Sequence, residues 1–371
     1  MRFVFTESLG CVWGNDYCRF LFEGTKPLGG GETAILRTAF ELAKNGHSVD
    51  VYYPGKEDRY LGVDFHPKVN AYSRVLLGDY DVLVSWSDAE AIRMAPAHVR
   101  KIFSQQLNDM PVDRNFWKAI DAVVSPSYTH LRFLMNYAPP GASCAWVEMG
   151  GGADQERFTN VRPWQDRKHV VVYASSPDRG LHHLLAVWPE VRARVPDAEL
   201  RLFYNPQRFV DWLNGPRELG FNMDVVTRGK TLNKLISPMP AGARSFGAVS
   251  QSELAKHLSE CRVLAFPLDP VAATEGFGQT VARALAAGMW VVSRPEDAFP
   301  ELYQDAVQWI DGGIVDDAWR ARFRDALVEA LLSESNPYEK AARHVLTDLT
   351  WERSARQIER AATLCLGGTM A

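Results

Sequence analysis

The sequence predicts an α/β protein built from two doubly wound, Rossmann-like domains. Two stretches, residues 2–53 and 263–293, each run in the order strand, glycine-bearing loop, helix, strand. This order is typical of the phosphate-binding units of doubly wound sheets. A length of 371 residues also exceeds what one core usually supports, so two domains are expected.

The bulk composition restricts the function classes. A hydrophobic content of 46% and a charged content of 23% are ordinary for a soluble globular protein. The net charge of -4 argues against a general nucleic-acid binder, which would be basic. The five cysteines are scattered without the spacing of a zinc site or a disulfide framework, so we expect a cytoplasmic protein. No apolar run approaches the ~20 residues that span a bilayer, which leaves peripheral membrane attachment open.

The first domain is expected to cover residues 1–160. Short apolar runs predict its strands at residues 2–6, 49–53, 80–85, 101–105 and 122–125. Residues 27–32 read PLGGGE and directly precede a helix with an apolar face. Their spacing differs from the dinucleotide fingerprint GxGxxG, and a loop that only needs positive φ is the alternative interpretation.

Polar and aromatic side chains follow two of these strands. Trp86 follows the strand at residues 80–85, and Gln106, Asn108 and Asp109 follow the strand at residues 101–105. Open α/β sheets bind ligands at the carboxyl ends of their strands, so these residues are candidates for binding an acceptor. Trp86 is equally compatible with packing, and the Asn-Asp pair with a simple turn.

Asp79 and Asp81 form a DxD sequence, a pattern that can bind metal. Both precede an apolar strand, and no glycine loop or second ligand accompanies them. A solvated strand start explains them better, and we predict no metal.

The second domain is expected to cover residues 161–348, followed by a C-terminal helix within residues 349–371. Its predicted strands are residues 169–173, 199–204, 263–266 and 290–293. Helical patterns cover residues 182–194, 318–332 and 351–364. Residues 206–243 contain four prolines and allow no assignment.

The loop before the helix in the stretch 263–293 carries the main chemical signal. Glu275, Gly276, Phe277 and Gly278 stand at the entrance of this helix. A helix N-terminus presents free N–H groups and a partial positive charge, which suit a phosphate. An acid beside an anion site makes sense when the ligand also carries hydroxyl groups, as a nucleotide-sugar does. The alternative is that Glu275 only complements the helix dipole.

This stretch resembles the donor-binding segment of family-4 retaining glycosyltransferases of the GT-B fold. The matching residues are Glu275 to Gly278 and the sequence ALAAG at residues 284–288. Four more segments resemble family motifs and occur in the same order: GGGE at 29–32, GGGAD at 150–154, SSPDRGL at 175–181 and FGAVSQSEL at 246–254.

The resemblance implies two Rossmann-like domains that face each other across a cleft, with the last helix crossing back to the first domain. It implies transfer of a sugar from a nucleoside-diphosphate sugar to a hydroxyl of a carbohydrate or glycoconjugate. Retention of the anomeric configuration, no metal and no cofactor are part of the same expectation.

The resemblance also assigns roles to individual residues. Arg179 stands where the family has a lysine, and it would stabilise the leaving diphosphate, while Glu275 would hold the sugar. These two are the expected catalytic residues. The expected donor-binding residues are Gly30, Gly31, Ser175, Ser176, Arg179, Val249, Glu275, Gly276, Phe277, Gly278, Thr280 and Arg283.

Two positions depart from the family pattern. Arg283 replaces the second acid, which usually holds the ribose. Three placements are open for it: a pair with Glu275, a contact with a phosphate, or a position in solvent. Ser175 replaces an arginine, so the second diphosphate cation is missing, and Lys230 is one guess for it.

These departures keep other functions open. One is an inactive, transferase-like partner subunit. The others are a sugar-nucleotide epimerase or a phosphorylase of the same fold. An epimerase should show more acids and histidines around the site, and a phosphorylase with pyridoxal phosphate would need a dedicated lysine.

Overall fold

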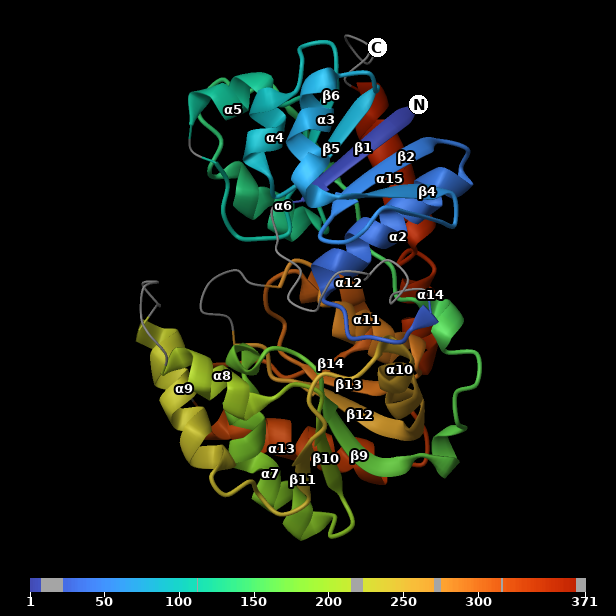
Figure 1. The fold of residues 1–371 in the computed structure, drawn as a ribbon. Helices are drawn as coiled ribbons and strands as arrows, with labels where there is room; N and C mark the ends of the chain where they lie inside the picture. The colour runs from blue at the N-terminus through green and yellow to red at the C-terminus, as the bar shows by residue number, and fades with distance from the viewer. Residues whose placement is uncertain (8–22, 112, 215–222, 270–274, 315, 365–371) are drawn as a thin grey trace. The chain divides into compact units, whose positions relative to one another are not determined.

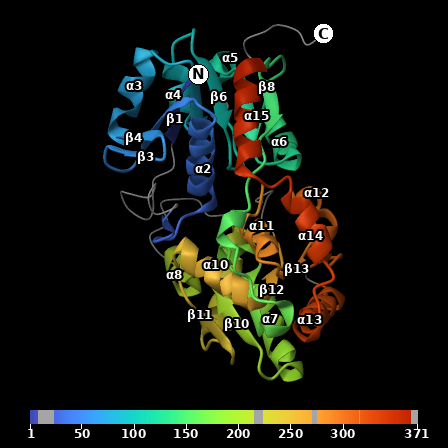
Figure 2. The same ribbon diagram turned by 90° about the vertical axis from the view of Figure 1, so that its right-hand side faces the viewer.

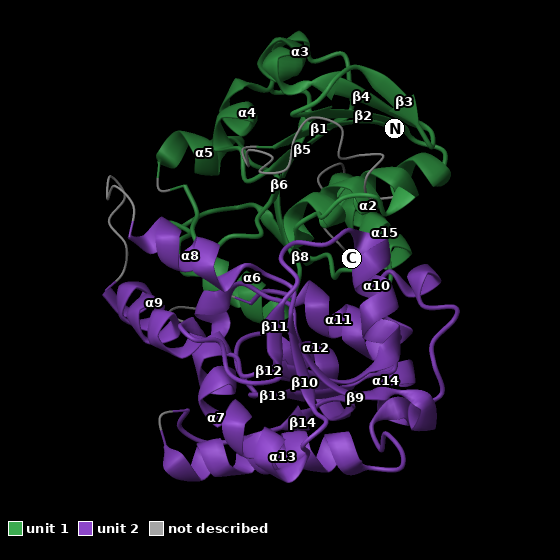
Figure 3. Cartoon of the chain, turned by 60° about the horizontal axis from the view of Figure 1, so that its bottom comes forward, with its two compact units in different colours: residues 1–152, 349–371 green, residues 153–348 purple. Residues whose placement is uncertain are grey.

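The structure, a computed structural model, describes residues 1–7, 23–111, 113–214, 223–269, 275–314 and 316–364. The chain divides into unit 1, residues 1–152 and 349–371, and unit 2, residues 153–348 (Figure 3). The division falls before the expected boundary at residue 160. The reason is local: Nε2 of Gln155 donates to the carbonyl of Leu346 at 2.8 Å, which binds this segment into unit 2.

Unit 1 is a doubly wound sheet of eight strands. Its strand order is β3-β4-β2-β1-β5-β6-β7-β8, and every neighbouring pair is parallel except β3 with β4 (Figure 1). The strands are β1 (Arg2–Glu7), β2 (Ser48–Tyr53), β3 (Asp58–Tyr60), β4 (Val63–Pro67), β5 (Val82–Trp86), β6 (Arg100–Ser104), β7 (Ala122–Ser125) and β8 (Ala145–Glu148). The helices are α2 (Gly30–Lys44), α3 (Ala71–Leu77), α4 (Ala89–Met94), α5 (Arg114–Ala119), α6 (Tyr128–Met135) and α15 (Trp351–Leu364).

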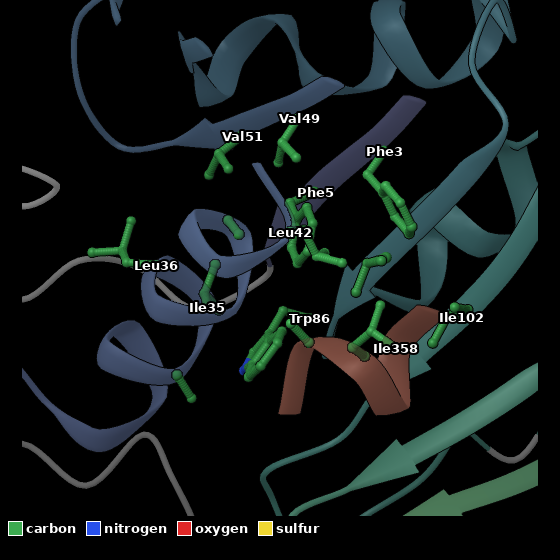
Figure 4. Close-up of a cluster of buried hydrophobic side chains, with 14 of the residues drawn as sticks. Phe3, Phe5, Ile35, Leu36, Leu42, Val49, Val51, Trp86, Ile102 and Ile358 are labelled. Atoms are coloured by element: carbon green, nitrogen blue, oxygen red, sulfur yellow. The ribbon is translucent and has the colours of Figure 1, made fainter. Parts of the chain in front are cut away.

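The last helix, α15, is part of unit 1. It runs beside α2 (Figure 2). Trp351 joins the core that α2 forms with β1, β2 and β5, and so does Ile358 (Figure 4). At its start, Nη1 of Arg353 donates to Glu148 at 2.9 Å. A side chain at Gly152 would come within 2.5 Å of the Trp351 ring, so the chain needs glycine there.

Unit 2 is a parallel sheet of six strands in the order β11-β10-β9-β12-β13-β14. The strands are β9 (Lys168–Tyr173), β10 (Glu199–Leu202), β11 (Ala243–Ser245), β12 (Cys261–Phe266), β13 (Trp290–Ser293) and β14 (Gln308–Trp309). The helices are α7 (Leu181–Arg194), α8 (Pro206–Leu213), α9 (Met223–Ile236), α10 (Gln251–Glu260), α11 (Gln279–Ala286), α12 (Phe299–Tyr303), α13 (Asp317–Leu332) and α14 (Glu339–Leu346). Every residue of β12 is buried, as expected of a central strand covered on both faces.

The proline-rich segment that the sequence left unassigned is largely helical where the structure describes it. Pro206 occupies the first turn of α8, where its missing N–H costs nothing. Helix α9 follows, and the short strand β11 ends the segment. Among the described helices, none is both long and apolar enough to cross a membrane.

Candidate functional site

The strand order of unit 2 places a topological switch point between β9 and β12. The chain passes from β9 outward to β10, and from β12 outward to β13 on the other side. Ligands of open α/β sheets bind outside the carboxyl ends of the strands at such a point. The loop at residues 174–180 follows β9, and the loop that leads to α11 follows β12.

These two loops are held against each other. Gly180 has φ of 104°, and a Cβ atom there would lie 2.0 Å from the carbonyl oxygen of Pro267. The hydroxyl of Thr280, in the first turn of α11, donates to the carbonyl of Ala174 at 2.7 Å. These contacts hold the loop 174–180 against Pro267 and the first turn of α11 at the switch point.

Gly278 sets the N-terminus of α11. It is the N-cap with φ of 72°, and a Cβ atom there would lie 2.4 Å from the Phe299 ring. The hydroxyl of Tyr303 donates to the carbonyls of Phe277 and Gly278. No acid stands in the first turn of α11, so its N–H groups and dipole favour an anion.

Arg179 and Glu275 meet at this helix N-terminus. Nη1 of Arg179 lies 2.9 Å from Oε1 of Glu275, and the side chains are only 22% and 16% exposed. Nε and Nη1 of Arg179 are buried and make no hydrogen bond of regular geometry with a described residue, although Nη1 lies against Glu275 and Nε lies 3.5 Å from Oδ2 of Asp178. Buried donors are almost always satisfied in native proteins, so these two N–H groups point to an acceptor from a ligand.

Glu275 is a perturbed acid. Burial raises the pKa of Glu275 to about 7, against the lowering effect of Arg179 and with help from the charges of Asp297 and Asp178. Its own backbone N–H donates to Asp297 at 3.1 Å. Glu275 therefore changes charge near neutral pH, which is a common property of functional carboxylates.

Arg283 pairs with Asp154, a partner that the sequence did not suggest. Its Nε and Nη2 both donate to Oδ2 of Asp154, at 2.9 and 2.6 Å, and both side chains are buried. Pairing with Glu275 is wrong, because Arg179 occupies that position. A solvent-directed side chain is also wrong. Contact of Arg283 with the phosphates of the sugar donor stays a prediction. The guanidinium would then bind both Asp154 and the phosphate.

Unit 1 has its own switch point, between β1 and β5. Gly30 and Gly31 form the first turn of α2 rather than a loop before it. Trp86, at the end of β5, is fully buried in the core (Figure 4). We therefore correct its expected role in stacking on an acceptor, since an inward-facing indole fills space between the sheet and its helices.

The loop after β6 is organised by Gln105, which sequence reasoning missed. Its Oε1 accepts from the Ser87 hydroxyl at 2.5 Å, and its Nε2 donates to Asp109. The carbonyl of Asn108 accepts from Tyr137 at 3.0 Å, and Gln106 is half-buried. The signal that could have identified Gln105 is an amide side chain at the last position of a predicted strand. Acceptor binding by Gln106, Asn108 and Asp109 stays a prediction.

Comparison with known proteins identifies part of this architecture. Residues 167–333 match the family model described as glycosyl transferases group 1. The matched stretch lies within unit 2. The match confirms the predicted enzyme class, a glycosyltransferase, and it includes Arg179, Glu275 and Arg283.

Solved structures confirm the predicted GT-B fold along the whole chain. AviGT4, a glycosyltransferase involved in avilamycin A biosynthesis, aligns with a TM-score of 0.67 at 15% identity, covering 100% of this chain and 99% of that one. Sucrose-phosphate synthase from Thermosynechococcus elongatus aligns with a TM-score of 0.66 at 13% identity, and the alignment covers 100% of each chain. Anabaena HepE in complex with UDP-glucose aligns with a TM-score of 0.65 at 13% identity, covering 98% of this chain and 100% of that one. No curated protein sequence matches the chain.

A second charge cluster adjoins the loop 174–180 of unit 2. Arg228 of α9 donates to the carbonyls of Asp178 and Asp269, and its Nη2 lies 3.0 Å from Oδ1 of Asp269. Arg228 is thus a further cation beside this loop, and Lys230, the residue suggested from the sequence, is exposed; the identity of the second diphosphate cation stays a prediction. Sequence reasoning missed Arg228 because a lone arginine on an unassigned segment gives no signal.

Asp269 also faces two imidazoles. Nε2 of His183 lies 3.0 Å from its Oδ2, and that of His182 lies 3.8 Å away. Among the described residues, these three form the one group that could hold a metal. Arg228 and the N-terminus of α7 both disfavour a cation there. Burial and the neighbouring His183 lower the pKa of His182 to about 3, so it is neutral. The expectation of no metal and no cofactor stays a prediction.

The remaining predicted positions are placed as follows. The DxD acids stand at the amino end of β5 and contact arginines: Asp81 accepts from the backbone N–H of Arg2 at 2.7 Å, and Asp79 pairs with Arg74. Ser175 and Ser176 are half-buried in the loop 174–180, and Val249 precedes the N-cap Ser250 of α10. Gly276 lies between Glu275 and Phe277. Their roles in binding the donor stay predictions.

Proposed function

We propose that the chain transfers a sugar from a nucleoside-diphosphate sugar to an acceptor hydroxyl, with retention and without a metal. One observation carries the proposal: Arg179 and Glu275 form a largely buried ion pair at the N-terminus of α11, in which Nε and Nη1 of Arg179 make no hydrogen bond of regular geometry with any described residue. A diphosphate supplies oxygens for the guanidinium and the helix, and the attached sugar supplies hydroxyls for the carboxylate.

The diphosphate gains negative charge as the glycosidic bond breaks. Groups that meet this charge in fixed positions lower the barrier more than they tighten ground-state binding. Arg179 and the first N–H groups of α11 take this role. The loop contacts of Gly180 and Thr280 keep them in place. Glu275 accepts hydrogen bonds from the sugar and fixes its orientation.

Metal independence follows from the same charges. Arg179 and the positive end of α11 supply the positive charge that a divalent cation supplies to the diphosphate in metal-dependent enzymes. Arg228 adds a further cation next to the loop 174–180, although Asp269 balances it. In a retaining reaction of this kind the leaving diphosphate assists in removing the acceptor proton, so no protein base is required.

The test is turnover of defined donors by the purified protein. UDP-glucose is the first choice, because HepE was solved with it, followed by other UDP-, GDP- and ADP-sugars. We expect release of the nucleoside diphosphate from one donor, undiminished by EDTA. Proton NMR of the sugar product would show the donor's anomeric configuration. Inversion, or a strict requirement for a divalent cation, would contradict the corresponding part of the proposal.

The alternatives predict different outcomes in the same assay. An epimerase would convert the sugar while it stays attached to the nucleotide. An inactive partner subunit would release nothing from any donor. We also propose a cytoplasmic location, with which the buried free thiols of Cys144 and Cys261 agree.

A further inference from the structure

Unit 2 contains a pocket of about 460 Å³ at the C-terminal end of α11, the end opposite Gly278. Its walls are the segment 155–167, the residues 285–288 and helix α14 with Asn336. The volume is in the range of small-molecule sites. None of the residues proposed to bind the donor lines it.

The lining is rich in arginine. Arg162, Arg167 and Arg343 line the pocket, and Glu339 is the one acid among the lining residues. Three cations against one carboxylate favour an anionic ligand.

Arg167 is the fixed cation of the pocket. It is buried, and Nε, Nη1 and Nη2 donate to the carbonyls of Arg162, Cys261 and Ala287 at 3.0, 3.2 and 2.8 Å. These bonds use three of the five N–H donors of a guanidinium. Burial lowers the pKa of Arg167 to about 10, so it stays charged at neutral pH. Its bond to Ala287 also offsets the negative end of α11, which would otherwise repel an anion.

The other two arginines can release their present partners. Arg343 pairs with Glu339 on the surface of α14, and such exposed pairs contribute little. Nη2 of Arg162 lies 3.5 Å from Glu260, which has a second cation, Lys168, at the same distance. Glu260 therefore keeps a partner when Arg162 turns to a ligand.

The rest of the lining is apolar. Phe158, Trp164, Leu285 and Leu346 contribute side chains, and the polar groups of Gln155 and Asn336 are bound to backbone. We propose that the pocket binds a small amphipathic anion, with an aromatic or aliphatic body and one carboxylate, phosphate or sulfonate group. The body packs on the apolar wall, and the acid group meets the arginines. This site is separate from the donor site and does not depend on glycosyl transfer.

Two matched probes test the proposal on the full-length protein. 1-Anilinonaphthalene-8-sulfonate carries an aromatic body and an anionic group, and N-phenyl-1-naphthylamine is its neutral counterpart. We expect the fluorescence titration to give about tenfold tighter binding of the sulfonate. In Arg162→Glu/Arg343→Glu this preference should vanish. The control Arg356→Glu/Arg360→Glu, which reverses two exposed charges on α15, should keep it.

A substitution that fills the pocket tests whether the probe binds there. Ala286→Trp places an indole in the pocket, since Ala286 is half-buried in its lining, and should weaken both probes at least about tenfold. Circular dichroism checks that each variant is folded. Equal affinity for both probes, unchanged binding in the charge-reversed or the filled variant, or displacement of the sulfonate by UDP would overturn the proposal.

Discussion

Arg283 and Asp154 form a buried ion pair inside unit 2, with Nε and Nη2 of the arginine at 2.9 and 2.6 Å from Oδ2 of the aspartate. Asp154 stands at the start of unit 2, and Arg283 stands on the helix that the donor is proposed to contact. The pair therefore joins the first residues of the unit to α11. It also explains how an arginine is tolerated where the resembled family has an acid.

Breaking this pair should destabilise unit 2. Arg283→Gln or Asp154→Asn breaks the ion pair and leaves the opposite charge buried, which costs about 3–5 kcal/mol of unfolding free energy. Because both single changes remove the same interaction, the double variant should lose much less than their sum. Urea denaturation of the four proteins measures this coupling, and strictly additive losses would show that the pair contributes nothing.

Loss of the Arg179 or Glu275 side chain should nearly abolish transfer. Removing one preorganised group that meets transition-state charge lowers kcat by about 10²–10³-fold. Arg179→Lys keeps the charge but loses the planar fork, so its activity should fall between wild type and Arg179→Ala. Lys234→Ala, on the exposed face of α9, is the control and should behave as wild type. Turnover by Arg179→Ala or Glu275→Ala at the rate of the control would contradict the assignment of these residues to the donor site.

The affinity for a free nucleoside diphosphate should fall as the pH rises through about 7. Burial raises the pKa of Glu275 to about 7, so the carboxyl is largely neutral at pH 6 and ionised at pH 8. The ionised form repels the phosphates and competes for Arg179. Calorimetric titration at pH 6, 7 and 8 gives the trend. The nucleotide itself also titrates in this range, and Glu275→Gln keeps that contribution while removing the contribution of Glu275. The same pH dependence of the affinity in Glu275→Gln and wild type would refute the role of Glu275.

Gly278→Ala should destabilise unit 2 and impair donor binding. The substitution combines a left-handed backbone with a Cβ atom 2.4 Å from the Phe299 ring, which together cost roughly 2–4 kcal/mol. Gly247→Ala is the matched control, because φ there is 69° and nothing lies within 4 Å of the added atom. It should lose only about 1–2 kcal/mol. Chemical denaturation compares the two variants, and equal losses would show that the contact with Phe299 is unimportant.

The fold could be predicted because its strands are short apolar runs between glycine loops and amphipathic helices. Strand β12 has only buried residues, and the small side chains of α11 let the helix lie close to β12 and β13. The edge strand β11 has an exposed and half-buried sequence without such a pattern. Helix α8 has an apolar face, but it is short and begins at a proline, which obscured it in the sequence. Local periodicity reports burial, so elements at the margin of a sheet are the ones that it misses.

The site could be predicted only where a local motif carries it. Glu275 and Gly278 stand in one loop, and Arg179 stands in another with its own motif. The partners of these residues come from distant segments: Asp297 lies beyond β13, Arg228 lies on α9, and Asp154 lies at the start of the unit. No local pattern pairs such residues, because tertiary packing brings them together. Trp86 shows the opposite error, since an aromatic residue at a strand end can point into the core.

The most direct test of the central claim is a thermal-shift measurement against UDP, GDP, ADP, CMP and their sugars, with and without a chelator. A ligand that binds only the folded protein raises its melting temperature. We predict stabilisation by several degrees with one nucleoside diphosphate, unchanged by the chelator and lost in Arg179→Ala. No shift with any member of the panel would contradict a nucleotide-sugar site in this chain.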